Sequence, residues 1–182
     1  MTKSISFVSF KNLGLDDLKK ILDLRNLPYI KEQMVNDKDI SLSSHLSFCQ
    51  CLKHRNDKFY FAIKYEKSIV GVINFNDIKT CAGGNTNNKY SSLGYYFVNQ
   101  PYKDFAKDSF YIISSIAHNM GIAYFDIFVK KSNAKGLHFA KDKLKAKYIK
   151  DDDIFSYFKL NVEVDTNKIK ALQQSFNIKY DL

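Results

Sequence analysis

Arg25 has a position that suggests chemistry, because the chain contains only two arginines. It follows Leu15, Leu18 and Leu22 at helical spacing, so its side chain should share their apolar face and point inward. A guanidinium in that position offers a rigid fork of donors for a phosphate or a carboxylate. The alternative is an arginine at a helix C-terminus that pairs with a nearby acid or with the helix dipole. The residues alone leave both interpretations open.

Several other polar groups lack the spacing that catalysis or metal binding requires. The apolar segment 104–119 contains two serines and His118, but no acid stands at triad spacing, which argues against a serine nucleophile. The Cys49-x-Cys51 pair lacks the two-residue spacer and the second ligand pair of a zinc site, so no metal is expected. The three acids at 151–153 point to different faces, which is typical of a turn between strands.

The charge balance favours an anionic partner, since 28 Lys and Arg stand against 19 acids and give a net charge of +9. A basic protein usually meets nucleic acid, a membrane surface or a phosphorylated ligand. No arginine-rich helix or RNP-like motif is found, so no nucleic-acid partner is expected. No window of about 18 apolar residues occurs, and the N-terminus lacks an apolar signal region. We therefore expect no membrane partner, a cytoplasmic location and reduced cysteines.

The elements that must position these residues follow from hydrophobic periodicity. With 182 residues, the chain is expected to form one domain that can bury its own core. Alternating apolar residues predict strands, and apolar residues three or four apart predict helices. The predicted strands are 4–10, 59–65, 68–78, 90–99, 121–130 and one or two strands within 148–164. The predicted helices are 15–26, 41–52, 104–119, 132–146 and 165–176, and residues 80–89 are expected to form a polar loop.

The order β-α-α-β-β-β-α-β-α-β predicts an α/β (α+β) fold with a mixed, mostly antiparallel sheet and helices on both faces. A meander of antiparallel strands comes first, and a helix then crosses to a central strand at 121–130 that is apolar on both faces. Residues 1–164 are expected to form a single domain. Residues 165–182 are expected to form a C-terminal helical appendage of that domain.

This order of elements resembles the GNAT superfamily of acyl-CoA-dependent N-acetyltransferases. Local motifs narrow the resemblance to the sugar-nucleotide acetyltransferases of pseudaminic acid biosynthesis. The motifs that resemble that family's first two helices are Leu24-Arg25-Asn26-Leu27-Pro28, Met34, and Ile40-Ser41 with His45 and Phe48. Those that resemble its second strand, third strand and last core helix are Tyr60-Phe61-Ala62-Ile63, Val70-Gly71-Val72-Ile73 and Ser132-Asn133-Ala134-Lys135-Gly136-Leu137. The match spans about residues 10–160.

The resemblance implies acetyl-CoA as co-substrate and acetyl transfer to the amine of a small-molecule acceptor, an amino sugar or nucleotide sugar. In the family, acetyl-CoA contacts the backbone of the fourth strand, and its diphosphate lies on N–H groups at the start of the next helix. The expected cofactor-binding residues are Tyr96, Phe97, Val98, Lys103, Phe105, Ala106, Lys107, Asp108 and Asn133. A homodimer is compatible with the resemblance.

On the acceptor side, the resemblance implies substrate-binding roles for Arg25, Met34 and His45. His45 lies on an apolar stripe, where a core histidine is an even alternative to a sugar-nucleotide contact. Met34 has the ordinary alternative of a core methionine. Two phosphorylated ligands would also account for a basic protein without any nucleic acid.

Two departures from the family pattern bear on catalysis. Residues 105–107 are Phe, Ala and Lys, where the family has glycines that let the backbone approach phosphate. Ala140 stands seven residues after Asn133, where many members carry a tyrosine that protonates the leaving thiolate. His138 is a weak substitute, because it lies about 200° around a helix from that position, and a surface histidine is the alternative. A second hypothesis therefore remains, a GNAT-fold binding or accessory module without catalysis.

Overall fold

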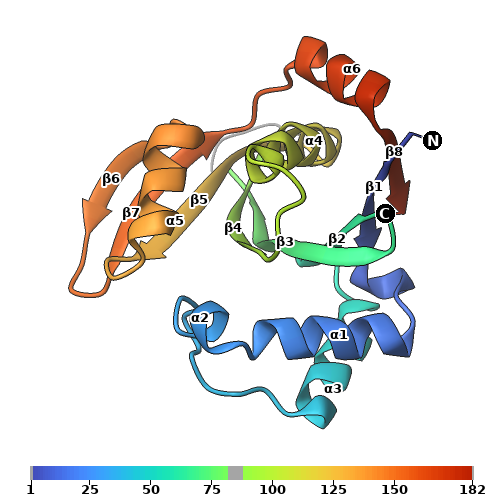
Figure 1. Ribbon diagram of the computed structural model, residues 1–182. Helices are drawn as coiled ribbons and strands as arrows, with labels where there is room; N and C mark the ends of the chain where they lie inside the picture. The colour runs from blue at the N-terminus through green and yellow to red at the C-terminus, as the bar shows by residue number, and fades with distance from the viewer. Residues whose placement is uncertain (1, 82–87, 182) are drawn as a thin grey trace.

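The computed structural model describes residues 2–81 and 88–181, so most of the polar loop expected at 80–89 lies outside the described residues. Within them, eight strands form one mixed sheet in the order β6-β7-β5-β4-β3-β2-β1-β8 (Figure 1). The strands are β1 (Ser4–Ser9), β2 (Phe59–Tyr65), β3 (Ser68–Thr80), β4 (Lys89–Phe97), β5 (Ile122–Lys130), β6 (Lys147–Asp151), β7 (Phe155–Asn161) and β8 (Asn177–Asp181). Only the β4–β5 and β1–β8 pairs in this part of the chain are parallel, which confirms the predicted mixed sheet.

Helices cover both faces of the sheet, as predicted (Figure 1). One face carries α1 (Leu15–Arg25), α2 (Pro28–Lys31) and α3 (Leu42–Leu52). The other face carries α4 (Phe105–Asn119), α5 (Ala134–His138) and α6 (Thr166–Ser175). A 3-10 turn at Phe10–Asn12 joins β1 to α1, and a π-helical segment at Phe139–Lys143 continues α5.

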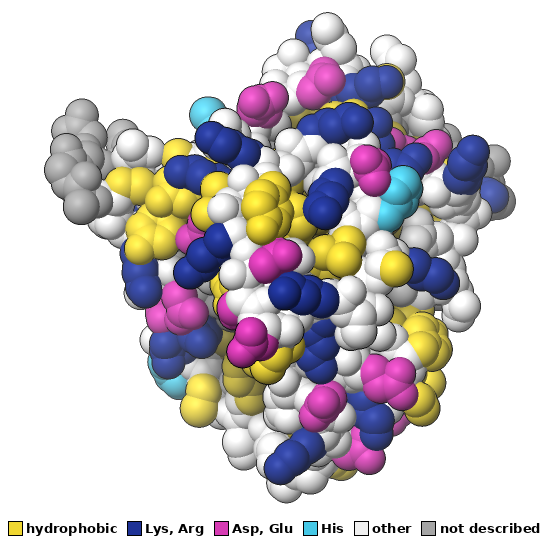
Figure 2. All heavy atoms as spheres, turned by 90° about the vertical axis from the view of Figure 1, so that its left-hand side faces the viewer, with side chains coloured by type: hydrophobic (Ala, Val, Ile, Leu, Met, Phe, Trp, Pro, Cys, Tyr) yellow, Lys and Arg dark blue, Asp and Glu magenta, His cyan; other side chains and the backbone are white. Residues whose placement is uncertain are grey.

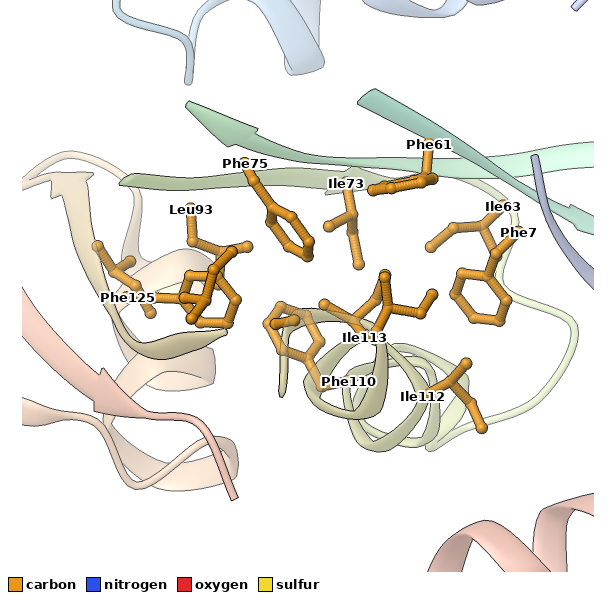
Figure 3. Packing of buried hydrophobic residues seen from close by; sticks show 14 of the residues in the cluster. Phe7, Phe61, Ile63, Ile73, Phe75, Leu93, Phe110, Ile112, Ile113 and Phe125 are labelled. Carbon is orange, nitrogen blue, oxygen red and sulfur yellow. The ribbon is translucent and has the colours of Figure 1, made fainter. Parts of the chain in front are cut away.

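The larger core lies between α4 and the sheet, where Phe110 and Ile113 of α4 face the strands (Figure 3). The sheet side chains that they meet are fully buried or nearly so, and they include Phe7, Phe61, Ile63, Ile73, Phe75, Leu93 and Phe125. A smaller core lies under α1 and α3 on the other face and consists of Phe10, Ile21, Cys49, Leu52, Ala62 and Val72. Successive residues of a strand point to opposite faces, so β2 and β3, which contribute to both cores, carry buried apolar residues on both sides.

The basic charge is distributed over the surface. Figure 2 shows lysine and acidic side chains interspersed on the side of the molecule that is on the left in Figure 1. The surface lysines are therefore mixed with acids rather than gathered into a single band on this side. Among the described residues, no helix combines the length and the apolar character that a membrane span needs.

The tail of the chain differs from its prediction. Residues 165–182 were expected to form a helical appendage with its helix at 165–176. α6 matches this helix, but β8 follows it and was not expected. β8 pairs in parallel with β1, with Ile178 opposite Ile5. A five-residue edge strand carries too few alternating apolar residues to be recognised locally, and its partner lies at the far end of the chain.

Two helix boundaries also differ from their predictions. Pro28 was expected only to end α1, yet it also begins α2, where the missing N–H and fixed φ of a proline are well tolerated. The helix expected at 132–146 is regular only over α5, and the π-helical segment after it ends at Lys143.

Gly136 is required by the local packing at the start of α5. The Asn133 side chain caps this helix by accepting the Gly136 N–H at 2.8 Å. A Cβ atom on Gly136 would lie 2.6 Å from the Asn133 amide nitrogen and 2.9 Å from a Val129 methyl group. The Asn133-x-x-Gly136 spacing is thus explained by capping.

We expect Gly136→Ala to lower the free energy of unfolding by about 1–3 kcal/mol, because the new methyl group overpacks the contact with β5 and displaces the cap. Urea denaturation followed by circular dichroism measures this change. Gly14→Ala is the matched control, since nothing lies within 4 Å of a Cβ built there. An equal loss in both variants would contradict the packing explanation.

Candidate active site

The parallel strands β4 and β5 separate at one end of the sheet. Their pairing ends at Ser92 and Asp126, but β4 continues along β3 to Phe97, and β5 continues along β7 to Lys130. We call the space between residues 93–97 and residues 127–130 the splay. The side chains of Tyr95, Tyr96 and Phe97 are only half-buried, although β4 is a central strand.

The splay exposes one edge of the β4 backbone. The Val98 N–H donates to the Val70 carbonyl at 2.8 Å, so Val98 and Tyr96 direct their backbone polar groups toward β3. The intervening residues, Tyr95 and Phe97, must direct theirs into the splay. Of the three strand residues expected to bind the cofactor, Phe97 therefore has the appropriate backbone orientation. Tyr95 shares it and was missed, although it is adjacent in sequence.

The N-terminus of α4 follows the splay directly. The Phe105 N–H donates to the Tyr102 carbonyl at 3.2 Å, and the Ala106 N–H donates to Oε1 of Gln100 at 3.3 Å. Among the described residues, no hydrogen-bond partner accompanies the Lys107 N–H. Helix N-termini bind anions through such donors. Gln100 was missed by the sequence analysis, and it occupies a donor that an anion could take.

The Phe105 side chain does not obstruct this turn. It is fully buried, and its ring packs against the rings of Phe97 at 6.2 Å, Tyr65 at 6.2 Å and Tyr102 at 5.4 Å between centroids. Only the backbone of the turn therefore faces outward at this residue. The departure from the family's glycines is sterically harmless here, because the bulk of the side chain lies in the core.

Three lysines surround the outer side of the turn. Lys103, Lys107 and Lys143 line a depression of ≈ 90 Å³ together with Gln100, Asp104, Ala106 and Phe139. Lys143 comes from the π-helical segment, and its Nζ lies 3.9 Å from Asp104. The lysines outnumber the single acid, so the depression attracts anions. Asp108 faces inward, where burial raises its pKa and a contact with Tyr102 opposes this.

The segment after α5 supplies no obvious proton donor. Ala140 is completely buried in the π-helical segment. His138 is exposed, and its Nδ1 lies 2.7 Å from Asp142 one turn later, as in an ordinary surface pair. The Asn133 side chain is occupied by its cap. The Tyr95 ring packs 5.6 Å from that of Phe139, and burial raises the pKa of its hydroxyl.

Arg25 lies on the α1 face of the sheet, near the splay. One amino group, Nη2, donates to the Asn36 carbonyl, whereas Nη1 is buried without a partner in the described part of the chain. Burial lowers the pKa of Arg25, and nearby Tyr96 opposes this shift. A buried guanidinium nitrogen without a hydrogen-bond acceptor lowers the stability of the fold unless a ligand accepts its hydrogen bond. This is the feature expected of an anion-binding arginine.

The segment that joins α1 to α3 is anchored at both ends. Asn26 and Ile40 exchange two hydrogen bonds, at 2.9 and 3.0 Å, which close its base. Lys130, the last residue of β5, donates to the Glu32 carbonyl at 2.9 Å, and its Nζ lies 3.6 Å from Asp37. Residues 26–40 therefore extend from α1 to the β5 side of the splay. Half-buried Met34 belongs to this segment.

His45 lies between α1 and α3 and has little surface to offer a ligand. It is 6% exposed, and its Nε2 lies 3.7 Å from the Cys49 sulfur in the smaller core. Burial lowers its pKa, and a backbone contact with Leu18 partly opposes this. Of the two interpretations left open by the sequence, this geometry corresponds to the core histidine. Among the described residues, no three His, Cys, Asp or Glu side chains gather to hold a metal ion.

Known proteins with similar sequences are acetyltransferases. No protein-family model matches the chain. The PseH acetyltransferase of Campylobacter jejuni serotype O:2 is 34% identical over 76 residues, which are 42% of this chain and 48% of that protein. The chain thus spans about half the length of this relative. The PseH acetyltransferase of C. jejuni serotype O:23/36 is 26% identical over 154 residues, which are 83% of this chain and 90% of that protein.

Solved structures of the same fold include enzymes of this kind. The crystal structure of C. jejuni PseH in complex with acetyl coenzyme A has a TM-score of 0.63 at 21% identity and covers 87% of this chain and 99% of its own. The structure of FdhC, described as a nucleotide-linked sugar GNAT, has a TM-score of 0.67 at 21% identity, with coverages of 95% and 92%. At these identities the structural likeness establishes the fold. The chain has the GNAT fold, and its sequence is similar to those of two PseH acetyltransferases.

Proposed function

We propose that this protein is an acetyl-CoA-dependent N-acetyltransferase whose acceptor is an amino sugar carried by a nucleotide. The splay next to the N-terminus of α4 is the observation that carries the proposal. It combines an open strand edge, which suits an extended ligand with amide groups, with a lysine-lined helix start, which suits a diphosphate. The similarity to PseH and to the nucleotide-linked sugar GNAT supports the choice of acceptor.

On the acetyl-CoA side, the backbone groups of Tyr95 and Phe97 would pair with the amide groups of the pantetheine arm. The Lys107 N–H and the ammonium groups of Lys103, Lys107 and Lys143 would receive the diphosphate. Gln100 would release the Ala106 N–H when phosphate replaces it. The thioester would then lie between β4 and β5, where a peptide N–H can stabilise the charge that develops on its carbonyl oxygen.

On the acceptor side, Arg25 would hold a phosphate of the nucleotide through its unpartnered Nη1. Residues 26–40 would cover the acceptor, and the amine would point toward the thioester. The leaving thiolate would take its proton from solvent, because buried Ala140 offers none. Loss of a positioned general acid typically costs about 10²–10⁴-fold in rate.

Ala140 favours a second candidate function, acetyl-CoA binding without catalysis, because its side chain cannot donate a proton. A GNAT-fold module that binds acetyl-CoA but no longer transfers the acetyl group would tolerate alanine at this position. The two functions differ in one measurable property. The binding module would be stabilised by acetyl-CoA and would release no free thiol in the presence of an amino sugar.

Acetyl-CoA at about 100 times its dissociation constant should stabilise the protein by about 2.7 kcal/mol, which differential scanning fluorimetry measures as a rise in Tm. The Lys103→Ala/Lys107→Ala variant should bind about tenfold more weakly or worse, since each charge-assisted hydrogen bond contributes about 1.5–3 kcal/mol. Lys19→Ala/Lys20→Ala removes the same charge from the exposed side of α1 and should bind normally. If acetyl-CoA does not raise the Tm of the wild type, the transferase proposal is wrong. If both double variants lose the same affinity for acetyl-CoA, Lys103 and Lys107 are not part of the binding site.

Arg25→Ala should raise the KM for UDP-glucosamine by about tenfold or more while leaving acetyl-CoA binding unchanged, because it removes a charged donor from the acceptor alone. Arg25→Lys should recover only part of the loss, since lysine lacks the planar fork. Initial rates of thiol release measure both effects. Arg55→Ala is the control, because this other arginine forms an exposed pair with Asp57. A parallel loss of acetyl-CoA binding in Arg25→Ala would contradict the assigned role.

A further inference from the structure

Asp126 stands at the point where β4 and β5 part. It is the last β5 residue paired with β4, opposite Ser92, and it pairs with Lys159 of β7 on its other side. Its neighbours Phe125 and Ile127 are buried in the core under α4, so the Asp126 side chain points to the opposite face. Tyr96 shares that face with Ser92, and its hydroxyl donates to the Ile21 carbonyl of α1 at 3.5 Å. Asp126 therefore lies on the same face as Arg25.

The Asp126 carboxylate is half-buried and is not committed to another group. Among the described residues, it has neither a hydrogen bond nor an ion pair within 4.0 Å. Lys159 of β7 is the charged residue opposite Asp126, but its ammonium group lies over the Tyr124 ring, with Nζ 3.4 Å from the ring centre. Burial raises the pKa of Asp126, and Lys159 partly opposes this. On the β4 side its neighbour, Ser92, carries no charge.

Two acids of the segment 26–40, which lies on this face, are already paired. Asp37 lies 3.6 Å from Lys130, and Asp39 lies 2.7 Å from Lys31. Asp126 is thus distinguished from both by its environment, in addition to its position at the start of the splay.

The spacing along β5 suits an acceptor that carries an anion at one end and an amine at the other. At the far end of the strand, Lys130 donates to the Glu32 carbonyl of the segment 26–40, the same segment whose Asn36 carbonyl accepts from Arg25. Asp126 precedes Lys130 by four residues, a separation of about 13 Å at the rise of a β-strand. A sugar held by a phosphate at Arg25 could therefore extend toward Asp126 along this face.

We propose that Asp126 is the catalytic general base, a role that rests on the proposed acetyl transfer. Its carboxylate takes one proton from the acceptor ammonium and passes it to solvent. The nitrogen lone pair attacks the thioester carbon, the C–N bond forms, and the carbonyl π electrons move to oxygen. When the carbonyl re-forms, the C–S bond breaks. The nitrogen, cationic after attack, loses a second proton, which neutralises the thiolate through solvent. An ammonium and acetyl-CoA thus yield an amide, a thiol and one released proton.

The test compares Asp126→Asn with the wild type, with UDP-glucosamine as acceptor. The variant should lose about 10²–10⁴-fold in kcat/KM at neutral pH and should keep the full Tm rise with acetyl-CoA. The wild-type rate should rise with pH until Asp126 is ionised. The rate of the variant should rise only as the acceptor ammonium loses its proton to become the free amine. Lys159 and Tyr124 are the titratable groups beside Asp126. Tyr96, Arg25 and Lys130 share its face. The same curves in Lys159→Ala show the contribution of Lys159.

Two controls make the result decisive. Asp153→Asn changes an exposed acid outside the regular part of β6 and β7 and should leave the rate unchanged. Asp126→Glu retains a carboxylate and should recover part of the rate and the shape of the pH profile. A wild-type protein that acetylates neither UDP-glucosamine nor glucosamine 1-phosphate removes the proposed function and this role with it. A wild type that is active, with an Asp126→Asn variant that matches its rate and pH profile, overturns Asp126 alone.

Discussion

Hydrogen bonding between β4 and β5 stops after Ser92 and Asp126 although both strands continue, and the candidate active site depends on this interruption. Peptide groups that lose their partner in a buried sheet cost about 1–3 kcal/mol each unless water or a ligand satisfies them. Side-chain packing offsets part of that cost. The Tyr95 and Phe139 rings both pack on Phe110 of α4, at 5.2 and 5.5 Å, and so connect β4 with the π-helical segment after α5. A ligand with its own amide groups could therefore bind in the splay and pair with the free strand edge, while the core packing stays unchanged.

The turn after the splay shows how the backbone of a turn can stay accessible when its glycines are replaced by larger residues. A glycine-rich turn makes room for phosphate because no side chain intervenes. Here Phe105 points inward to an aromatic group formed by Phe97, Tyr65 and Tyr102, and so the outer surface of the turn stays open. Sequence comparison alone treats Phe105 as a defect in the binding turn. In the structure it is a core residue, and the lysines around the turn supply the positive charge.

The parts of the fold that were predictable are those with local physical signals. Alternation predicted β1 to β4, and the helical spacing of Leu18, Leu22 and Arg25 predicted an inward Arg25, because side-chain direction follows from the helix repeat. Leu15 was expected on the same inward face but is 52% exposed at the start of α1. β5 was expected to be apolar on both faces, but only one of its faces is mostly buried. Helices on both faces followed from the order of elements. β8 was missed because its pairing with β1 is non-local, and Asp126 was missed because a single acid in an apolar run has no motif. The splay is a property of two strands together, so neither strand's sequence reveals it.

The ends of the sheet bear on how copies of this protein can meet. β6 and β8 are its two edges, and each has only five residues and carries lysine and aspartate. β6 is also interrupted by an irregularity between Tyr148 and Lys150. Short, charged and irregular edges are the means by which β proteins avoid edge-to-edge association. Two copies of this chain would therefore associate through helices or loops, and the sheet would not continue from one copy to the next.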